Sequence, residues 1–176
     1  MVRVAGTIGE LEILERRRIE LVDPAIPDAR QPYHAAEHLP PAERDALVLR
    51  LLQSAYDHGR RALDGLLDGA AAVGLVGGPM LERTDASYVL AAHARMHATE
   101  GALFQDVIRR AAQAKGLPVL AVPEKQVFAE AALALNRSPE DLEAKLAATG
   151  KQVGPPWQHD HKLATLVALL ALDRTP

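Results

Sequence analysis

Cysteine is absent from the 176 residues, which excludes disulfide bonds, thiolate metal ligands and cysteine nucleophiles. Aromatic residues contribute only 3%, so the core must be built from Leu, Val, Ile and much Ala, a composition that favours closely packed helices. The hydrophobic share of 48% excludes a disordered chain. A formal net charge of −3 argues against a strongly basic nucleic-acid-binding protein, although it leaves room for a local patch.

Long hydrophobic runs are also lacking. The longest, Leu163 to Leu172, is far shorter than the ~20 residues that span a bilayer. The N-terminal stretch MVRVAGTIGELEIL has no apolar run followed by the small-residue cleavage site of a signal peptide. We therefore expect a cytoplasmic protein without a membrane partner, folded as one domain over residues 1–176.

Alternating and β-branched residues in the first two dozen positions predict an antiparallel meander of two or three strands. Five prolines between positions 24 and 41 then predict an ordered loop or a broken helical turn. Further along, the pattern predicts two buried strands, at 70–77 and 117–122, and helices at about 42–68, 84–115, 125–135, 139–149 and 158–172. The two buried strands flank a single long helix, so we expect them to be parallel and joined by a right-handed crossover.

This order of elements resembles the ribonuclease H-like fold and, within it, the Holliday-junction resolvase (RuvC-like) branch. The segments that carry the resemblance are the strand AAVGLVG, a helix containing HATEG, the strand LPVLAVPEK, an accessory helical segment and a last helix that opens with an acid. The resemblance implies an α/β, three-layer domain with a mixed central sheet. The segments QPYHA, HxxxHxxEG and GPPWxxDxK also resemble those of an uncharacterised bacterial family, which implies no activity.

In the resolvase branch, acids from the first strand, the end of the fourth strand and the last helix hold two divalent metal ions. The first strand here has no aspartate, and the nearest acid is Glu10. The fourth strand ends in Gly77 and Gly78, with Glu82 a few residues downstream, whereas the last helix does begin with an acid, Asp160. Either the metal site has been lost or it is rebuilt from other residues.

The segment AAHARMHATEG offers residues for a rebuilt site. His93, His97 and Glu100 are spaced i, i+4 and i+7, so they share one helix face, and a helical wheel places them within the apolar arc. Polar groups there need partners, because an unpaired buried polar group costs ~1–3 kcal/mol. Three interpretations stay open: a closed hydrogen-bonded network that caps loop amides and carbonyls, a metal or catalytic site, or a helix with a different phase.

Two further segments place polar residues near a site. In GPPWQHDHKL, Asp160 falls in the first turn of the last helix, where it is either a helix cap or a site residue, and Lys162 is its neighbour. In QPYHAAEH, the spacing H-x-x-E-H of His34 to His38 resembles an inverted zinc-peptidase motif. That motif needs a continuous helix, and the flanking prolines leave barely two turns. A Tyr33–His34 pair in an ordered loop would still close one side of a pocket.

The leading functional hypothesis is a metal-dependent phosphodiester hydrolase acting on nucleic acid, with a pocket formed by His34, His97, Glu100, Asp160 and Lys162. Glu100 and Asp160, with Glu82, would hold Mg²⁺ or Mn²⁺, a histidine would act as base or ligand, and Lys162 would bind phosphate.

Two alternatives remain. One is a catalytically inactive member of the fold that binds no metal and serves as an interaction or scaffold module, with a protein partner or as a homodimer. The other is a non-nuclease metalloprotein with imidazole ligands such as His93 and His97, which would prefer Zn²⁺ to Mg²⁺.

Overall fold

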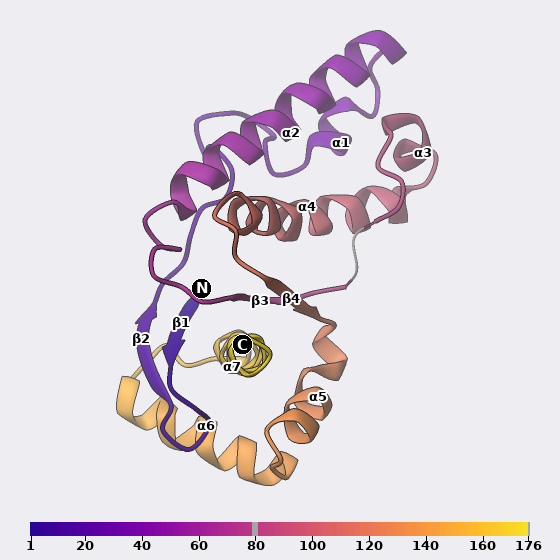
Figure 1. The fold of residues 1–176 in the computed structure, drawn as a ribbon. Coiled ribbons are helices and arrows are strands. Elements are labelled where there is room, and N and C mark those ends of the chain that lie inside the picture. The colour runs from indigo at the N-terminus through magenta and orange to yellow at the C-terminus, as the bar shows by residue number, and fades with distance from the viewer. Residues whose placement is uncertain (79–80, 176) are drawn as a thin grey trace. The chain divides into compact units, whose positions relative to one another are not determined.

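The computed structural model describes residues 1–78 and 81–175, and their contacts gather into two compact units (Figure 1). Unit 1 comprises residues 1–18, 69–78 and 116–175, and unit 2 comprises residues 19–68 and 81–115. Each unit has its own apolar core. The single domain expected from the sequence stays a prediction.

Unit 1 contains all four strands of the described residues. β1 (Val2–Ala5) pairs antiparallel with β2 (Glu12–Arg16), which confirms the N-terminal meander with two strands. β3 (Val73–Val76) pairs in parallel with β4 (Val119–Val122), as expected for the two buried strands. The strands form two separate two-stranded sheets. The mixed α/β class is therefore confirmed, whereas the single mixed sheet of a ribonuclease H-like domain is not.

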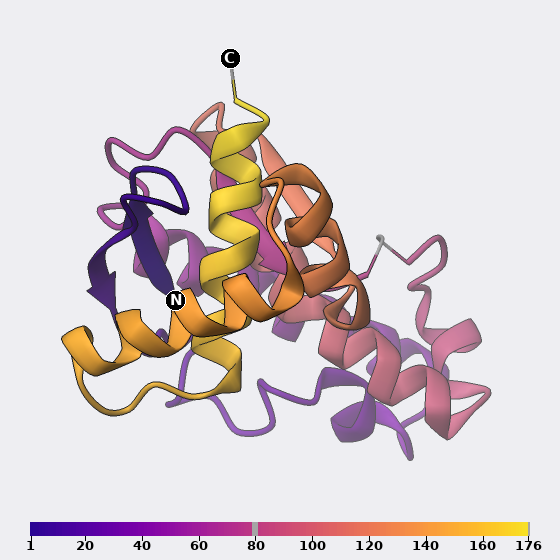
Figure 2. The ribbon, with the colours of Figure 1, turned by 90° about the horizontal axis from the view of Figure 1, so that it is seen from below.

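The helices of unit 1 follow β4 in the chain. They are the short 3₁₀ helix η1 (Glu124–Gln126), α5 (Val127–Ala134), α6 (Pro139–Val153) and α7 (His159–Asp173). In Figure 1 the view runs down α7, with β1 and β2, β3 and β4, and α5 on successive sides of it. Figure 2 shows α7 along its length, with α6 crossing it. This central position explains why α7 is apolar nearly all round.

The helix predicted at 139–149 continues through Gly150 to Val153. A Cβ on Gly150 would lie 2.2 Å from Cδ1 of Trp157, so this glycine provides room for the indole ring. The indole Nε1 donates to the carbonyl of Leu146 at 2.9 Å, which fixes Trp157 against α6 just before the start of α7. The helix ends instead at Gly154, whose φ of +73° suits glycine.

Gly74 of β3 packs directly against the backbone of α7. A Cβ added there would lie 2.5 Å from the carbonyl oxygen of Val167, a backbone atom of α7. We expect Gly74→Ala to lower the free energy of unfolding of unit 1 by about 3 kcal/mol, because the strand and the helix must separate to admit the methyl group.

Trp157, the sole tryptophan of the chain, reports on unit 1 through its fluorescence during urea unfolding. Gly78→Ala is the control, since a Cβ there meets nothing within 4 Å. Equal stability of the two variants would contradict the close packing of β3 against α7.

Unit 2 is helical throughout its regular structure. It comprises α1 (Pro32–Ala36), α2 (Pro41–Leu63), α3 (Ala86–Leu90) and α4 (His93–Ala114). In Figure 1, α1 lies between α2 and α4, and it contacts both. Apolar side chains of these helices form two buried clusters, one around Leu103 and Val107 and one around Tyr33 and Met96. Among the described residues, none of the helices is both long and apolar enough to cross a membrane.

Two of the expected helix boundaries in unit 2 are wrong. The helix predicted at 42–68 ends at Leu63 and is followed by turns. The helix predicted at 84–115 is broken after α3, because Ala92 is extended with φ −154° and ψ 126°. The Asp85 carboxylate caps α3 by accepting from the amide of Tyr88 at 3.0 Å. His93 consequently becomes the first residue of α4, which determines its place in the site.

Candidate metal centre

Three histidines of unit 2 converge at the start of α4. His93 and His97 are one turn apart on α4, and His34 comes from α1. One imidazole nitrogen from each lies within 4.8 Å of those of the other two, and the Nε2 atoms of His93 and His97 are 3.0 Å apart. The ring centroids are separated by 4.5 to 5.1 Å. Among the described residues, this group could hold a metal ion.

The Glu100 carboxylate joins α4 to the N-terminus of α1. Its Oε1 accepts from the amides of Tyr33 at 2.9 Å and His34 at 3.1 Å. The residue at the N-cap of α1, Gln31, makes no side-chain cap, so Glu100 satisfies these first-turn amides from another helix. Its side chain is only 5% exposed. Glu100 thus caps backbone amides, as in the hydrogen-bonded network that was one of the three interpretations of the sequence.

The second carboxylate oxygen of Glu100 orients the His34 ring. Oε2 lies 2.6 Å from Nδ1 of His34. An ionised carboxylate only accepts hydrogen bonds, so Nδ1 carries the proton and Nε2 presents its lone pair. Histidines that bind metals through one nitrogen commonly donate from the other to a carboxylate, which fixes the tautomer and the ring orientation. The Glu100–His34 pair has this arrangement.

The two histidines of α4 are exposed, which corrects the expectation that they face the core. The helical wheel correctly predicts that Met96 and Glu100 are buried. His93, however, is the first residue of α4, and neighbouring elements need not cover every apolar position in the first turn of a helix. His34 is 20% exposed. Since the imidazoles reach solvent, they would be accessible to an ion without opening the unit.

Only the first histidine of the H-x-x-E-H motif belongs to the cluster. α1 ends at Ala36, and both Glu37 and His38 are exposed. The motif therefore does not lie on one continuous helix, as its flanking prolines suggested. The sequence placed His34 in one pocket with His97 and Glu100, but it did not combine His34, His93 and His97 into one set of metal ligands. The signal for that pairing was weak, because the two segments are separated by more than one helix.

Tyr33 anchors α1 beneath the histidine cluster. It is fully buried, and its hydroxyl donates to the carbonyl of Thr84 at 2.8 Å. Burial, together with the negative charges of Glu100 and Asp85, raises the pKa of Tyr33 to about 12. The phenol therefore stays protonated over the physiological range and keeps its donor role. The expected Tyr33–His34 pair lies on the helix α1 and not in a loop, and neither residue lines the pocket found beside His97, so this expectation is corrected.

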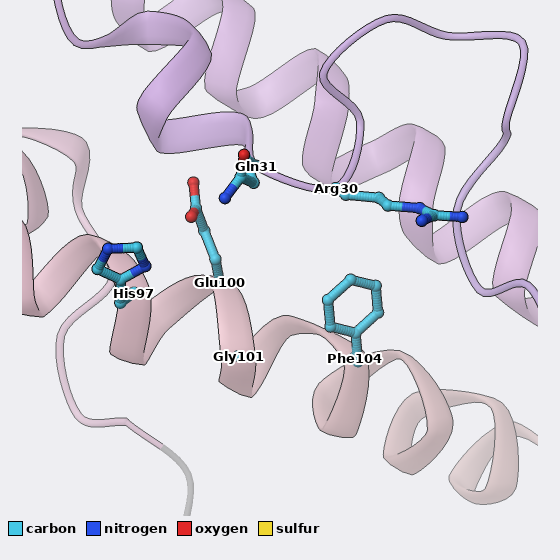
Figure 3. Close-up of a pocket in the computed structure, with 6 residues that line it drawn as sticks. All are labelled: Arg30, Gln31, His97, Glu100, Gly101 and Phe104. Carbon is cyan, nitrogen blue, oxygen red and sulfur yellow. The ribbon is translucent and has the colours of Figure 1, made fainter.

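A pocket of about 380 Å³ adjoins the cluster at His97 (Figure 3). His97, Glu100, Gly101 and Phe104 form one wall along α4, and Arg30 and Gln31 come from the segment that precedes α1. Figure 3 shows the Glu100 carboxylate pointing towards α1 and the Phe104 ring beside the Arg30 side chain. The pocket and the histidine cluster therefore share His97.

The other predicted site residues lie elsewhere. Glu82 is exposed in the segment before α3. Asp160 and Lys162 belong to unit 1, where Asp160 is an exposed acid in the first turn of α7 and Lys162 is half-buried. Gln158 and His161 cap the N-terminus of α7 by forming a reciprocal capping box. Asp160 keeps a favourable position at the positive end of the helix dipole.

The capping box makes the stability of unit 1 dependent on pH. Nδ1 of His161 accepts from the amide of Gln158 at 3.1 Å, which requires a neutral ring with its lone pair on Nδ1. Burial, together with the positive charges of Arg16 and the N-terminus, lowers the pKa of His161 below its ordinary value, and Asp160 opposes this shift. The unfolded chain then binds the proton at a higher pH than the folded protein. The stabilisation is complete above about pH 6.5 and is lost as the pH falls.

We expect His161→Gln to flatten this pH dependence, because glutamine at the same position accepts from the N-cap amide but does not titrate. The measurement is urea unfolding at pH 5 and pH 7.5, followed by Trp157 fluorescence. His159→Gln, at an exposed histidine of the same turn, should leave the pH dependence in place. An unchanged pH dependence in His161→Gln would contradict the role given to His161.

Comparisons of the chain with protein-family models, curated proteins and solved structures return no match.

Proposed function

We propose that unit 2 binds one divalent transition-metal ion, Zn²⁺ in preference to Mg²⁺, through His34, His93 and His97. The observation that carries this proposal is the convergence of three imidazole nitrogens within 4.8 Å, one of them on a ring held by Glu100. Zn–N bonds of about 2.0–2.1 Å in a tetrahedron place neighbouring nitrogens about 3.4 Å apart. Small side-chain rotations would bring the three rings to that spacing.

The donor set favours zinc over magnesium. Imidazole nitrogens suit Zn²⁺ and similar ions, whereas Mg²⁺ prefers carboxylate and water oxygens. Glu100, a buried carboxylate beside the cluster, already accepts three hydrogen bonds from α1. Its role is therefore to orient His34 rather than to supply a ligand oxygen. This engagement favours a three-histidine site over the carboxylate site expected from the sequence.

Three protein ligands leave a fourth coordination position for water, as in catalytic zinc sites and unlike closed structural ones. A zinc ion in such a site lowers the pKa of its bound water to about 7 and so supplies a hydroxide nucleophile at neutral pH. His93 and His97 are exposed to solvent, and His97 also lines the pocket. Water and a small molecule would therefore both reach the fourth coordination position. The chemistry that fits is metal-assisted hydrolysis of a small molecule.

A thermal-shift titration with Zn²⁺, Mg²⁺ and Mn²⁺, combined with equilibrium dialysis for stoichiometry, tests the proposal. An ion that binds only the folded state stabilises it by ~2.7 kcal/mol at 100 times its Kd. We expect Zn²⁺ to raise the melting temperature and to bind one ion per chain, with no comparable response to Mg²⁺. A response to Mg²⁺ or Mn²⁺ alone, or to none of the three ions, would refute the three-histidine site.

The Mg²⁺- or Mn²⁺-dependent phosphodiester hydrolase on a ribonuclease H-like fold stays a separate proposal. The sequence-based assignment gives it Glu82, Glu100 and Asp160 as metal ligands and Lys162 for phosphate, with nucleic acid as its substrate, although Glu100 already accepts three hydrogen bonds from α1. A nuclease assay with Mg²⁺ and Mn²⁺, repeated on Asp160→Asn, tests it directly. Cleavage that survives Asp160→Asn would contradict this assignment of the acids.

A further inference from the structure

The pocket beside His97 has a mixed lining. Phe104 supplies an aromatic ring, Gln31 an amide, Arg30 a guanidinium and Glu100 a carboxylate, whose two oxygens are already hydrogen-bonded to α1. Figure 3 shows the Arg30 side chain running past the Phe104 ring, at the end of the pocket away from His97. The pocket thus has a residue of the proposed metal site at one end, the aromatic ring of Phe104 along α4 and a positive charge at the other end.

Gly101 gives the pocket its depth. It faces the pocket between His97 and Phe104, and a Cβ built on it meets nothing within 4 Å. Glycine in the interior of a helix is unfavourable by roughly 0.5–1 kcal/mol relative to alanine, and here no neighbouring atom requires it for packing. The space above Gly101 is therefore available to a bound molecule.

Arg30 offers donors at the far end. Its Nη2 donates to Oε2 of Glu20 at 2.7 Å, and its side chain is 56% exposed. A guanidinium carries five N–H donors in a fixed fork, and this ion pair uses one of them. The fork matches a second carboxylate in the bidentate manner typical of arginine. The Glu20 contact holds the guanidinium beside the pocket.

We infer that this pocket binds a small dicarboxylic acid with an apolar body. One carboxylate would occupy the open position of the metal ion, the body would lie over Gly101 and Phe104, and the second carboxylate would meet Arg30. This inference rests on the metal site proposed above. His97 and Phe104 are separated by seven helical residues, or about 10 Å along the axis, which sets the length of the ligand. A volume of about 380 Å³ suits a small organic molecule.

A matched pair of acids tests the inference by isothermal titration calorimetry on the full chain loaded with Zn²⁺. The probes are 3-phenylpropionate and 3-(4-carboxyphenyl)propionate, which share their body and differ by one carboxylate. We expect the diacid to bind at least tenfold more tightly, because the second carboxylate forms charge-assisted hydrogen bonds with Arg30. In Arg30→Gln the two affinities should converge to within about twofold, since the charge is lost.

Two further variants complete the test. Gly101→Leu introduces a strong helix former whose side chain fills the pocket, so both acids should bind at least tenfold more weakly while Zn²⁺ binding is unchanged. Arg60→Gln, which removes an exposed charge of α2, should preserve the preference for the diacid.

The experiment distinguishes failure of the metal site from failure of the dicarboxylate inference. If Zn²⁺ itself does not bind, both the metal site and the inference are wrong. If Zn²⁺ binds but the diacid shows no preference, or the preference survives in Arg30→Gln, the inference alone is overturned.

Discussion

Replacement of His97 by alanine is expected to weaken Zn²⁺ binding by a factor on the order of 10²–10³. Four-ligand zinc sites bind with about 10–16 kcal/mol, or roughly 2.5–4 kcal/mol per ligand, and His97 is one of the three protein ligands proposed here. Competition with a chromophoric chelator at fixed pH measures the change in Kd. The fold should persist, because His97 is exposed within α4 and alanine is the better helix former.

His38→Ala is the matched control for this experiment. His38 is exposed, comes four residues after His34 and lies beyond the end of α1. Its loss should leave the Kd for Zn²⁺ within about twofold of the unaltered protein. Equal weakening in His38→Ala and His97→Ala would indicate scattered surface binding and would argue against a site built by His34, His93 and His97.

The second large effect concerns Glu100, where two substitutions separate its structural role from its positioning role. Glu100→Ala removes the acceptor for the amides of Tyr33 and His34 and for Nδ1 of His34. Hydrogen bonds to a charged group contribute about 1.5–3 kcal/mol each, and the amide of Tyr33 would be left buried without a partner. We expect a loss of about 3 kcal/mol in the free energy of unfolding, measured by far-UV circular dichroism in urea, which follows the helices of both units, beside Trp157 fluorescence, which follows unit 1.

Glu100→Gln should instead act mainly on the metal. The glutamine carbonyl can still accept from the two amides of α1, but its NH₂ group can only donate to Nδ1 of His34. His34 then shifts its proton to Nε2, the nitrogen proposed to bind the ion. We expect Zn²⁺ binding to weaken 10–100-fold, with a smaller loss of stability than in Glu100→Ala. Unchanged Zn²⁺ affinity in Glu100→Gln would show that Glu100 only caps α1.

Much of unit 1 could be predicted from the sequence, because its signals are local. Strand alternation, the Ser138 cap of α6 and the continuous apolar surface of α7 all appear in the structure. The sequence also predicted the parallel pairing of β3 with β4. What it could not supply is whether the two pairs of strands join into one sheet. The two-stranded sheets stay separate in the described residues, although the order of elements suggested one mixed sheet.

One helix end was predicted wrongly because a contact with a residue outside the helix overrides local preference. A glycine such as Gly150 is typical of a helix end, yet the helix continues because the Trp157 ring packs on that glycine. The break before α4 falls at Ala91 and Ala92, which are strong helix formers, so helix propensity gave no sign of it.

For the candidate site, as for the fold, the sequence predicted the local features but not the long-range contacts. The spacing of His93, His97 and Glu100 correctly placed them on one face of α4 and indicated that Glu100 needs partners. The identity of those partners, the amides of α1 and His34, depends on the packing of α1 against α4. A helical wheel also cannot show where the covering neighbour ends, which is why the exposure of His93 and His97 was missed.

X-ray absorption spectroscopy at the zinc edge on the protein loaded with one equivalent of Zn²⁺ tests the central claim most directly. The account predicts four-coordinate zinc with three imidazole nitrogens at about 2.0–2.1 Å and one oxygen, and the loss of one imidazole contribution in His97→Ala. A shell of oxygen ligands with fewer than two imidazoles, or an identical spectrum in His97→Ala, would contradict a metal site built from His34, His93 and His97.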